Sequence, residues 1–474
     1  MKFRVEREAW GEAVAWAARA LPTRPVVPVL SGLLLQAGAD GLTVSCFDYE
    51  VSARIVIAAE IAEPGSALVP GRLLAEITRS LPAQPVELSF GGDADMVSLS
   101  CGGAEFSVVS LEMQDYPALP EPPEPAGTVD GGVLAAAAAQ VVPSASRDDT
   151  LPMLTAVCLE IDGQLMTLAA TDRYRLAVRE LPWAPAEPGA RAAALVPART
   201  LADVARTMSA GVPVTIAFGA GGTGLRGGST AQVPSAAADG PAADRPAAAD
   251  GQPPAGKPGR PGAGQPSAAS PRPAEGMISF EGGGRRLTAR LIGGEFIRYR
   301  SRFPADFGCT ADLPAAPFTE AVRRVALVTD RTSPVRLSFG ASHVTVEAAT
   351  DGRARAVESV PAEFTGDERV ISFNPHYLLD GLAAAALPAA APSSAASSRA
   401  DGEPGGSDAG AGSGDTDGAA GRADGEAAQA PARVRLQFTS PAKPALITRA
   451  SEDGGPEQDG FRYLVVPLRV PASA

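Results

Sequence analysis

The chain has 474 residues, of which 45% are hydrophobic, and a formal net charge of −13. This length and apolar content allow about three domains of ordinary size, each with its own core. The negative charge argues against a protein that holds nucleic acid by bulk attraction, because neutralising phosphates requires clustered Lys and Arg. The net charge does not exclude a locally basic surface.

The N-terminal residues MKFRVEREAW alternate charged and apolar side chains, and no apolar run reaches the roughly 18 residues that a membrane span requires. Four cysteines lie far apart, at Cys46, Cys101, Cys158 and Cys309, and the chain has only two histidines. These spacings match no metal-ligand motif. We therefore expect a soluble cytoplasmic protein with reduced cysteines, no bound metal and no cofactor.

Three segments of the chain repeat one order of elements. A helix is expected at residues 10–21, where apolar side chains recur at helical spacing, a second at 134–142 and a third around 322–326. Each is followed by a segment that alternates like a strand pair, at residues 32–55, 156–178 and 335–357. Three aspartates occupy matching positions in these segments: Asp48, Asp172 and Asp351.

A strand that runs into a helix follows in each repeat, as ALVPGRLLAEITRSL, ALVPARTLADVARTM and VISFNPHYLLDGLAAA. Pro70, Pro197 and Pro375 are expected in the first helical turn, where a missing N–H is tolerated. Self-similarity of this kind predicts three tandem domains of one architecture.

Two stretches, about residues 220–275 and 388–432, have too few large apolar residues to offset the entropy of ordering them. We interpret them as disordered insertions. The first should lie at the turn of a hairpin and the second between a helix and a strand, where a long loop costs little free energy. The second is acidic, so the folded part is less negative than the whole chain.

Two glycine motifs raise the alternative of a nucleotide-binding enzyme. Residues 219–224 fit G-x-G-x-x-G and follow an expected strand, but no helix follows to offer its N-terminus to a pyrophosphate. Residues 251–258 fit G-x-x-x-x-G-K, but Pro258 stands where Ser or Thr would bind Mg²⁺. The chain has no G-x-S-x-G motif, and Asp93 and Asp95 are typical of a solvated turn. No catalytic arrangement is visible.

The chain resembles the beta sliding clamps of bacterial replicative DNA polymerases. The resemblance rests on the threefold repeat and on the segments MKFRVERE, RPVVPVLSGLLLQ, SRDDTLPMLT, ATDRYRLAV, NPHYLLDGL and YLVVPLRV. It implies an α+β fold of three clamp domains, at 1–122, 123–309 and 310–474, with helices inside and antiparallel sheets outside, closed into a head-to-tail ring dimer. A ring holds double-stranded DNA by topology, so a few inward arginines would suffice in an acidic chain.

The resemblance implies sequence-independent DNA contacts from helices and loops that face the hole. The candidates are Arg19, Arg24, Arg72, Arg79, Arg147, Arg199, Arg206, Arg323 and Arg324. Ordinary solvated helix faces are the alternative for each. The helix at 134–142 has no basic residue.

Ring closure would join the edge strand in AEFSVVSL to the third domain of a second chain, with Phe106, Val108, Ala326 and Leu327 at the interface. For Phe106 and Val108, a place in the core of one chain stays open.

The resemblance also implies a pocket between the second and third domains for short peptides of the replicative polymerase, the clamp loader, repair polymerases and ligase. Its residues would be Leu154, Thr171, Arg173, Tyr174, Arg175, Leu176, Ile297, Tyr377, Leu464, Val465, Val466, Pro467, Leu468 and Arg469. Pro467 predicts that the last strand lies at a sheet edge, because a proline has no N–H to give to a central ladder. Apolar edge strands bind peptides, but a terminal core strand is the alternative.

The chain departs from the family pattern at this pocket. Ile297 stands where the family usually has proline, Tyr174 replaces a frequent histidine, and residues 471–474 extend past the usual end. The function we expect is that of a processivity factor without its own catalytic site, which tethers the replicative polymerase to DNA. The alternatives are a paralogous clamp that gives self-resistance to a clamp-directed natural product and a monomeric peptide-binding scaffold.

Overall fold

The computed structural model describes residues 1–91, 95–208, 211–218, 276–330, 333–350, 353–388, 432–450 and 460–468. The two stretches expected to be disordered lie outside the described residues, apart from Pro388 and Ala432. The glycine motifs at 219–224 and 251–258, Asp93, Asp351, Arg469 and residues 471–474 also lie outside them.

One order of elements occurs three times in the described part of the chain: a strand, a helix, five strands, a second helix and three strands. The first unit comprises β1 (Lys2–Val5), α1 (Arg7–Arg19), β2 (Gly32–Gly38), β3 (Gly41–Phe47), β4 (Val51–Ile57), β5 (Glu60–Glu63), β6 (Gly65–Pro70), α2 (Gly71–Ser80), β7 (Val86–Phe90), β8 (Met96–Cys101) and β9 (Ala104–Val109).

The second and third units follow the same order. The second comprises β10 (Glu124–Asp130), α3 (Gly131–Val141), β11 (Ala156–Asp162), β12 (Leu165–Thr171), β13 (Arg175–Pro182), β14 (Ala184–Pro185), β15 (Arg191–Pro197), α4 (Ala198–Thr207), β16 (Pro213–Phe218), β17 (Met277–Gly282) and β18 (Arg285–Arg290). The third comprises β19 (Cys309–Pro314), α5 (Ala315–Val325), β20 (Val335–Phe339), β21 (His343–Thr350), β22 (Ala354–Pro361), β23 (Glu363–Thr365), β24 (Arg369–Phe373), α6 (Pro375–Ala386), β25 (Arg433–Phe438), β26 (Ala445–Ala450) and β27 (Phe461–Val465).

The expected strand pairs are in fact three strands each, so that prediction was wrong. The second turn was missed in the first two units because no glycine forms it; in the third unit it falls at residues 351–352, outside the described residues. In the first unit the Asp48 carboxylate accepts hydrogen bonds from the N–H groups of Glu50 and Val51, and Tyr49 takes a left-handed φ of 72°. Asp172 makes the same turn in the second unit, with Arg173 at φ 81°. An aspartate side chain can thus form a tight turn that composition does not reveal.

Each unit also opens with a strand rather than with the expected helix. The strand β1 has only four residues, and β10 contains Pro125 and Gly127, which hide its strand pattern. The expected helix at 134–142 begins earlier, at Gly131, because the Asp130 carboxylate caps it through the N–H groups of Gly132 and Val133. Pro375 is the first residue of α6, as predicted, whereas Pro70 and Pro197 stand one residue before α2 and α4.

Two nine-stranded antiparallel sheets cross the boundaries between units. In the first, of order β14-β10-β16-β17-β18-β4-β3-β2-β6, the boundary of units 1 and 2 lies between β18 and β4. In the second, of order β15-β11-β12-β13-β27-β26-β25-β19-β23, the boundary of units 2 and 3 lies between β13 and β27. We call these the unit 1/2 boundary and the unit 2/3 boundary. A five-stranded sheet ending in β9 and a four-stranded sheet ending in β22 lie at the two ends of the chain's arc.

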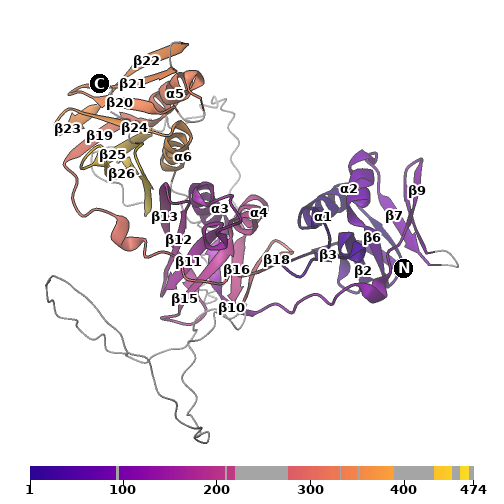
Figure 1. Ribbon diagram of the computed structural model, residues 1–474. Helices are drawn as coiled ribbons and strands as arrows, with labels where there is room; N and C mark the ends of the chain where they lie inside the picture. Colours follow the sequence, from indigo (N-terminus) through magenta and orange to yellow (C-terminus); the bar gives the residue numbers. More distant parts are fainter. Residues whose placement is uncertain are drawn as a thin grey trace, which may run out of the picture.

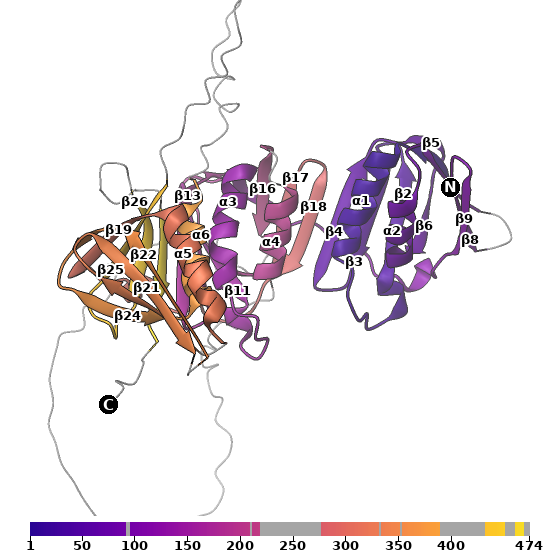
Figure 2. The ribbon, with the colours of Figure 1, turned by 90° about the horizontal axis from the view of Figure 1, so that it is seen from above.

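The helices lie together on one side of this arc, and the sheets form the other side (Figures 1 and 2). Within each unit, buried side chains such as Trp10, Leu201 and Phe318 pack the helices onto the inner faces of the sheets. No helix in the described ranges is long and apolar enough to cross a membrane. The first insertion site lies between the paired strands β16 and β17, and the second between α6 and β25, as predicted.

Candidate binding surfaces at the unit boundaries

The last strand, β27, lies inside a sheet and not at an edge. It pairs with β13 through Leu176 and Leu464, and with β26 through Leu464 and Leu446. The prediction from Pro467 was wrong because the strand ends at Val465, two residues before the proline, so no ladder position falls on it. The chain beyond the strand still bonds to both units: the Val466 N–H donates to the Tyr174 carbonyl oxygen at 2.8 Å, and the Leu468 N–H to that of Ser372 at 2.8 Å.

Three leucines form a row across the unit 2/3 boundary on the outer face of the sheet. Leu176, Leu464 and Leu446 occupy paired positions on β13, β27 and β26, and all three are buried in one apolar cluster. The cluster also contains Cys158, Ala169, Val178, Leu195 and Tyr299. An apolar row at the junction of two units is the kind of floor on which an apolar side chain of a partner can pack.

The segment that connects units 2 and 3 covers this cluster. Phe296, Ile297 and Phe303 of the segment pack against it, and each is half-buried. Gly294 lies beside Met153, since a Cβ on the glycine would stand 3.7 Å from the Met153 Cε atom. The structure therefore packs Ile297 against the cluster that contains Leu176 and Leu464, which lie far from it in the sequence.

Two tyrosines and an arginine join the units next to the leucine row. The rings of Tyr174 and Tyr377 stack with centroids 5.9 Å apart, and the Arg175 guanidinium lies 4.6 Å from the centroid of the Tyr377 ring. Arg175 pairs with Asp172 at 3.0 Å and also with Asp380 of α6. The expected residues Tyr174, Arg175 and Tyr377 thus lie in contact with one another.

Large apolar side chains are exposed around these contacts. Tyr174 is 50% exposed, Val466 and Leu468 are each 38% exposed, and Leu151 and Met153 of the neighbouring loop are similarly exposed. Leu154, Thr171 and Val465 are buried, so these expected residues support the surface from below. We call the exposed group Leu151, Met153, Tyr174, Val466 and Leu468 the unit 2/3 surface.

Sequence reasoning missed Leu446, Met153 and Asp380. Met153 and Asp380 lie within SRDDTLPMLT and NPHYLLDGL, two segments singled out above, so their neighbourhood was visible. Leu446 carries no such signal. Its contact with Leu464 arises only from the register of β26 and β27.

The equivalent positions at the unit 1/2 boundary are polar. Ser52, Thr288 and Ser279 occupy the paired positions on β4, β18 and β17, and the Thr288 hydroxyl lies 3.1 Å from that of Ser279. Glu50 takes the place of Tyr174 and Arg290 that of Val466, because the Arg290 N–H donates to the Glu50 carbonyl as Val466 does to Tyr174. Their side chains approach to 3.7 Å. The same backbone therefore carries an apolar row across only one of these two boundaries.

The nine candidate arginines are all exposed, seven on helices and Arg24 and Arg147 in loops. Among the described residues, four of them have partners: Arg72 donates to the Pro22 carbonyl, while Arg206, Arg323 and Arg324 pair with Asp203, Glu320 and Glu358. Arg19, Arg24, Arg79, Arg147 and Arg199 form no ion pair with another described residue, which leaves their charge available to phosphate.

The inner faces of the two boundaries also differ. At the unit 1/2 boundary, Asp203 of α4 lies near Arg19, Arg199 and Arg206; burial nevertheless raises its pKa above the usual value, and the arginines offset this only in part. At the unit 2/3 boundary, α3 and α6 meet through a hydrogen bond from the Gln140 amide to the Ala384 carbonyl. Neither of these two helices carries Lys or Arg. Basic charge is therefore concentrated away from the unit 2/3 boundary.

Two exposed strand edges lie at the ends of the arc. On β9, Phe106 is half-buried against the core of the first unit, Val108 is buried in it, and Val109 is 60% exposed. Ala326 and Leu327 lie in a single 3-10 turn after α5, rather than in the helix itself, and Leu327 is 81% exposed. That turn contacts β22, the outer strand of the third unit.

The thiols and metal-ligating groups offer no reactive centre among the described residues. All four cysteines are free and buried. Burial raises the pKa of Cys46 and of Cys158 to about 12, which disfavours the nucleophilic thiolate. Within the described ranges, no group of three or more His, Cys, Asp and Glu residues could hold a metal ion.

Family models match the chain in three consecutive parts. They describe the N-terminal, central and C-terminal domains of the DNA polymerase III beta subunit and match residues 1–120, 128–237 and 300–391. The chain belongs to this beta subunit family. The three-domain sliding-clamp fold that the resemblance implied is thereby confirmed, and this chain functions as a sliding clamp.

Individual relatives agree with the family match. The beta sliding clamp of Streptomyces coelicolor is 40% identical over 470 residues, which cover 99% of this chain and 100% of that protein. The beta sliding clamp homolog GriR of Streptomyces muensis is 36% identical over 382 residues, 81% of this chain and 88% of that protein. A solved sliding clamp of Pseudomonas aeruginosa bound to griselimycin has a TM-score of 0.71 at 20% identity, covering 99% of this chain and 100% of that one, and supports the fold.

Proposed function

We propose that this beta subunit closes into a head-to-tail ring of two chains around double-stranded DNA and tethers the replicative polymerase to it. Its clamp domains would be residues 1–122, 123–309 and 310–474. In this proposal it acts as a processivity factor without catalysis of its own. The clamp loader, repair polymerases and ligase would bind in turn, through short peptide segments, at the unit 2/3 surface.

The observation that carries the peptide-binding proposal is the contrast between the two boundaries. Exposed apolar side chains cost free energy in water, and a partner that covers them recovers it, at about 25 cal/mol for each Å² of apolar area buried. At the unit 2/3 boundary such side chains surround a row of three buried leucines, whereas the equivalent row at the unit 1/2 boundary is Ser52, Thr288 and Ser279.

Truncation tests this proposal without removing a core strand. A chain that ends at Val465 keeps β27, whose residues are largely buried, but loses Val466 and Leu468. We expect it to bind a fluorescent peptide from the organism's replicative polymerase at least about tenfold more weakly than the full chain, as loss of two apolar contacts implies. Val370→Ala, which trims a 48% exposed side chain on β24, is the control. Equal affinity of the truncated and full chains would show that the peptide binds elsewhere on the chain.

Ring closure is supported by the two strand edges, because β9 and β22 present unpaired backbone groups, with the exposed Val109 on β9 and the exposed Leu327 in the turn that contacts β22. Light scattering during size-exclusion chromatography should give twice the chain mass of 48.0 kDa. A monomer at micromolar concentration would instead favour the peptide-binding scaffold.

After loading, the ring should stay on circular DNA and leave it once the circle is cut. Equal loss from circular and cut DNA would contradict topological holding.

A second candidate function is self-resistance to a clamp-directed natural product. The 36% identity to a protein named as a clamp homolog, GriR, and the departures at Tyr174 and Ile297 are compatible with it. Griselimycin, the compound bound in the Pseudomonas aeruginosa structure, is the probe. If this chain is a resistance paralogue, the polymerase peptide should stay bound at griselimycin concentrations that displace it from the Pseudomonas aeruginosa clamp. Displacement at the same concentrations would exclude this role.

A further inference from the structure

The segment that connects units 2 and 3 reaches the unit 2/3 surface across the outer face of a sheet. The Ile292 N–H donates to the Leu195 carbonyl of β15 at 2.9 Å, where the segment begins its crossing. Phe296, Ile297 and Phe303 then rest on the apolar cluster. Apolar contacts are non-directional, so they hold the segment to the sheet without fixing its position along it.

One polar contact supplies a fixed point. The Tyr299 hydroxyl donates to Glu160 Oε2 at 2.7 Å, and Arg300 Nη2 donates to the same oxygen at 2.9 Å. Tyr299 is 3% exposed and packs edge-on against Phe296, with ring centroids 6.1 Å apart. Burial raises the pKa of Tyr299, so its hydroxyl stays protonated and remains a donor. Glu160 therefore grips the segment two residues after Ile297.

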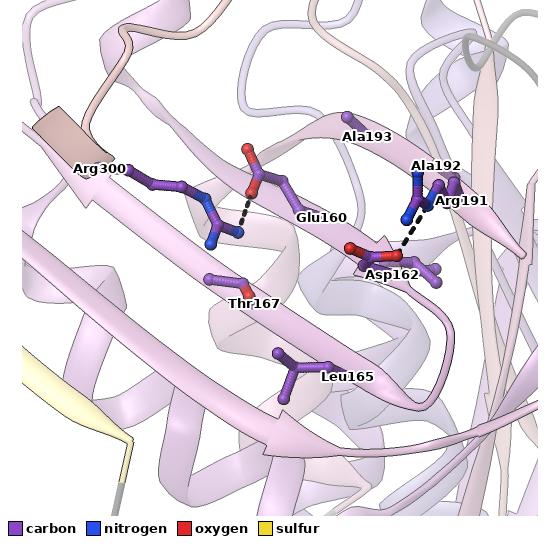
Figure 3. Close-up of a pocket in the computed structure, with 9 residues that line it drawn as sticks. Glu160, Asp162, Leu165, Thr167, Arg191, Ala192, Ala193 and Arg300 are labelled. Atoms are coloured by element: carbon purple, nitrogen blue, oxygen red, sulfur yellow. Dashed lines mark hydrogen bonds and ion pairs between the residues drawn. The ribbon is translucent and has the colours of Figure 1, made fainter. Parts of the chain in front are cut away.

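Glu160 has open space on its other side. A cavity of about 510 Å³ lies beside it, lined by Asp162, Leu165, Thr167, Arg191 and Arg300 among others (Figure 3). Packing therefore leaves the Glu160 side chain room to move, and its place is set by the two donors it accepts from. Asp162 and Arg191 pair at 2.8 Å on the same cavity. That pair involves no residue of the connecting segment, and Figure 3 shows it apart from the Glu160–Arg300 pair.

The first unit lacks such a grip at the equivalent place. Gln36 of β2 corresponds to Glu160 of β11, because both lie twelve residues before the aspartate turn, at Asp48 and Asp172. The segment that connects units 1 and 2 packs on its own cluster through Leu111, Tyr116 and Leu119. Among the described residues, no side-chain hydrogen bond joins Gln36 to that segment. In the described part of the chain, a side-chain hydrogen bond from the sheet to the connecting segment at this position therefore occurs at the unit 2/3 boundary and not at the unit 1/2 boundary.

We propose that Glu160 is a positioning residue for the unit 2/3 surface: through Tyr299 and Arg300 it fixes where Ile297 stands over the leucine row, and so sets the affinity and selectivity for the apolar side chain that a partner peptide places there. This inference rests on the proposed function. Glu160, Tyr299 and Arg300 lie outside the unit 2/3 surface, and their hydrogen bonds hold Ile297 in place beside it.

The test measures binding of the fluorescent polymerase peptide to the full chain and to Glu160→Leu, Tyr299→Phe and Glu160→Gln. We expect Glu160→Leu and Tyr299→Phe to weaken binding roughly tenfold, the equivalent of one net hydrogen bond. Glu160→Gln keeps an oxygen that accepts from Tyr299 and should restore affinity to within about threefold of the unsubstituted chain. Asp162→Asn, on the same cavity, is the matched control and should bind normally.

A second peptide separates positioning from general damage. In it, the apolar residue that contributes most to binding is replaced by alanine. Glu160→Leu should reduce the affinity for this second peptide little further, because the peptide has no large apolar side chain left to contact Ile297. A misfolded protein would instead lose affinity for both peptides alike. Unchanged binding of the original peptide by Glu160→Leu, or equal weakening by Asp162→Asn, would overturn the inference. Failure of the unsubstituted chain to bind the peptide would overturn the proposed function, and this inference with it.

Discussion

The unit 1/2 and unit 2/3 boundaries share a backbone and differ in chemistry. Both are antiparallel junctions within nine-stranded sheets, with the same paired positions and the same aspartate turn. One carries Ser52, Thr288 and Ser279 where the other carries Leu176, Leu464 and Leu446. On the inner side the order reverses, because arginines gather near α1 and α4 while α3 and α6 have neither Lys nor Arg.

The contrast indicates that side chains alone can give two junctions of one repeated fold different binding roles. The boundary with an apolar row has no Lys or Arg on its two inner helices, whereas the boundary with a polar row has arginines on its inner side. A polymerase peptide and the DNA backbone would thus be held mainly at different places of one chain. The predictions below test this separation.

The largest expected effect comes from making the unit 2/3 row resemble the other. Leu176→Ser should weaken binding of the polymerase peptide by about thirtyfold, because a leucine-sized apolar contact is worth about 2 kcal/mol. Fluorescence anisotropy measures it, with circular dichroism to verify folding. Ser52→Ala, at the equivalent position of the other boundary, should bind normally. If both substitutions weaken binding equally, the contrast between the boundaries has no bearing on peptides.

Asp380→Ala should lower the free energy of unfolding by about 1.5 kcal/mol. Arg175 has only 10% of its side chain exposed and would lose its partner in the third unit while keeping Asp172, and Asp380 itself is partly exposed, which limits the cost. Urea unfolding followed by circular dichroism provides the measurement. No change in the midpoint would mean that the units are held together by their sheet and helices alone.

Removing charge near the unit 1/2 boundary should weaken DNA binding modestly. Arg199→Ala is expected to reduce the slope of log K against log salt by about 0.9, the contribution of one phosphate contact, and to lower affinity about threefold near physiological salt. His376→Ala, on the exposed side of α6, is the control and should leave the slope unchanged. A larger loss with His376→Ala would place DNA against the unit 2/3 boundary.

The smallest effect is expected from Asp203→Asn, at the position that Asp380 occupies in the third unit. The folded protein raises the pKa of Asp203, so the charged carboxylate destabilises folding above that pKa, and the penalty disappears as the pH falls and the group is protonated. At pH 7 the variant should be as stable as the parent or more stable, by up to about 0.5 kcal/mol. Below about pH 4 the difference should vanish. A clear loss of stability at pH 7 would show that the three nearby arginines outweigh burial.

Much of the fold was predictable because most local sequence patterns occur in more than one of the three units. The helical stripe at Trp10, the proline before α4 and the aspartate turns each recur, and recurrence makes weak patterns reliable. What escaped prediction was decided by pairing. Pro467 indicated an edge strand, yet β27 ends before it and is paired on both sides. Composition cannot reveal which strand of another unit will cover an edge.

The candidate site was predictable where its residues lie in recognisable segments, as Tyr174 and Tyr377 do, and these two rings do stack. Leu446 and Glu160 escaped because nothing in their own segments distinguishes them. Leu446 gains its place from strand register, and Glu160 from a tyrosine 139 residues away in the chain. Long-range hydrogen bonds of this kind are visible only after folding.

The two sheets that cross the unit boundaries also have a mechanical consequence. At each internal junction the strands are joined by a continuous ladder of main-chain hydrogen bonds, five paired residues long between β13 and β27 and five between β18 and β4. Such ladders resist shear, because their bonds must break together. The edges β9 and β22 have no such ladder within one chain. In the proposed ring of two chains, we therefore expect force or loading to part the seam between the copies, while each three-unit chain moves as one body.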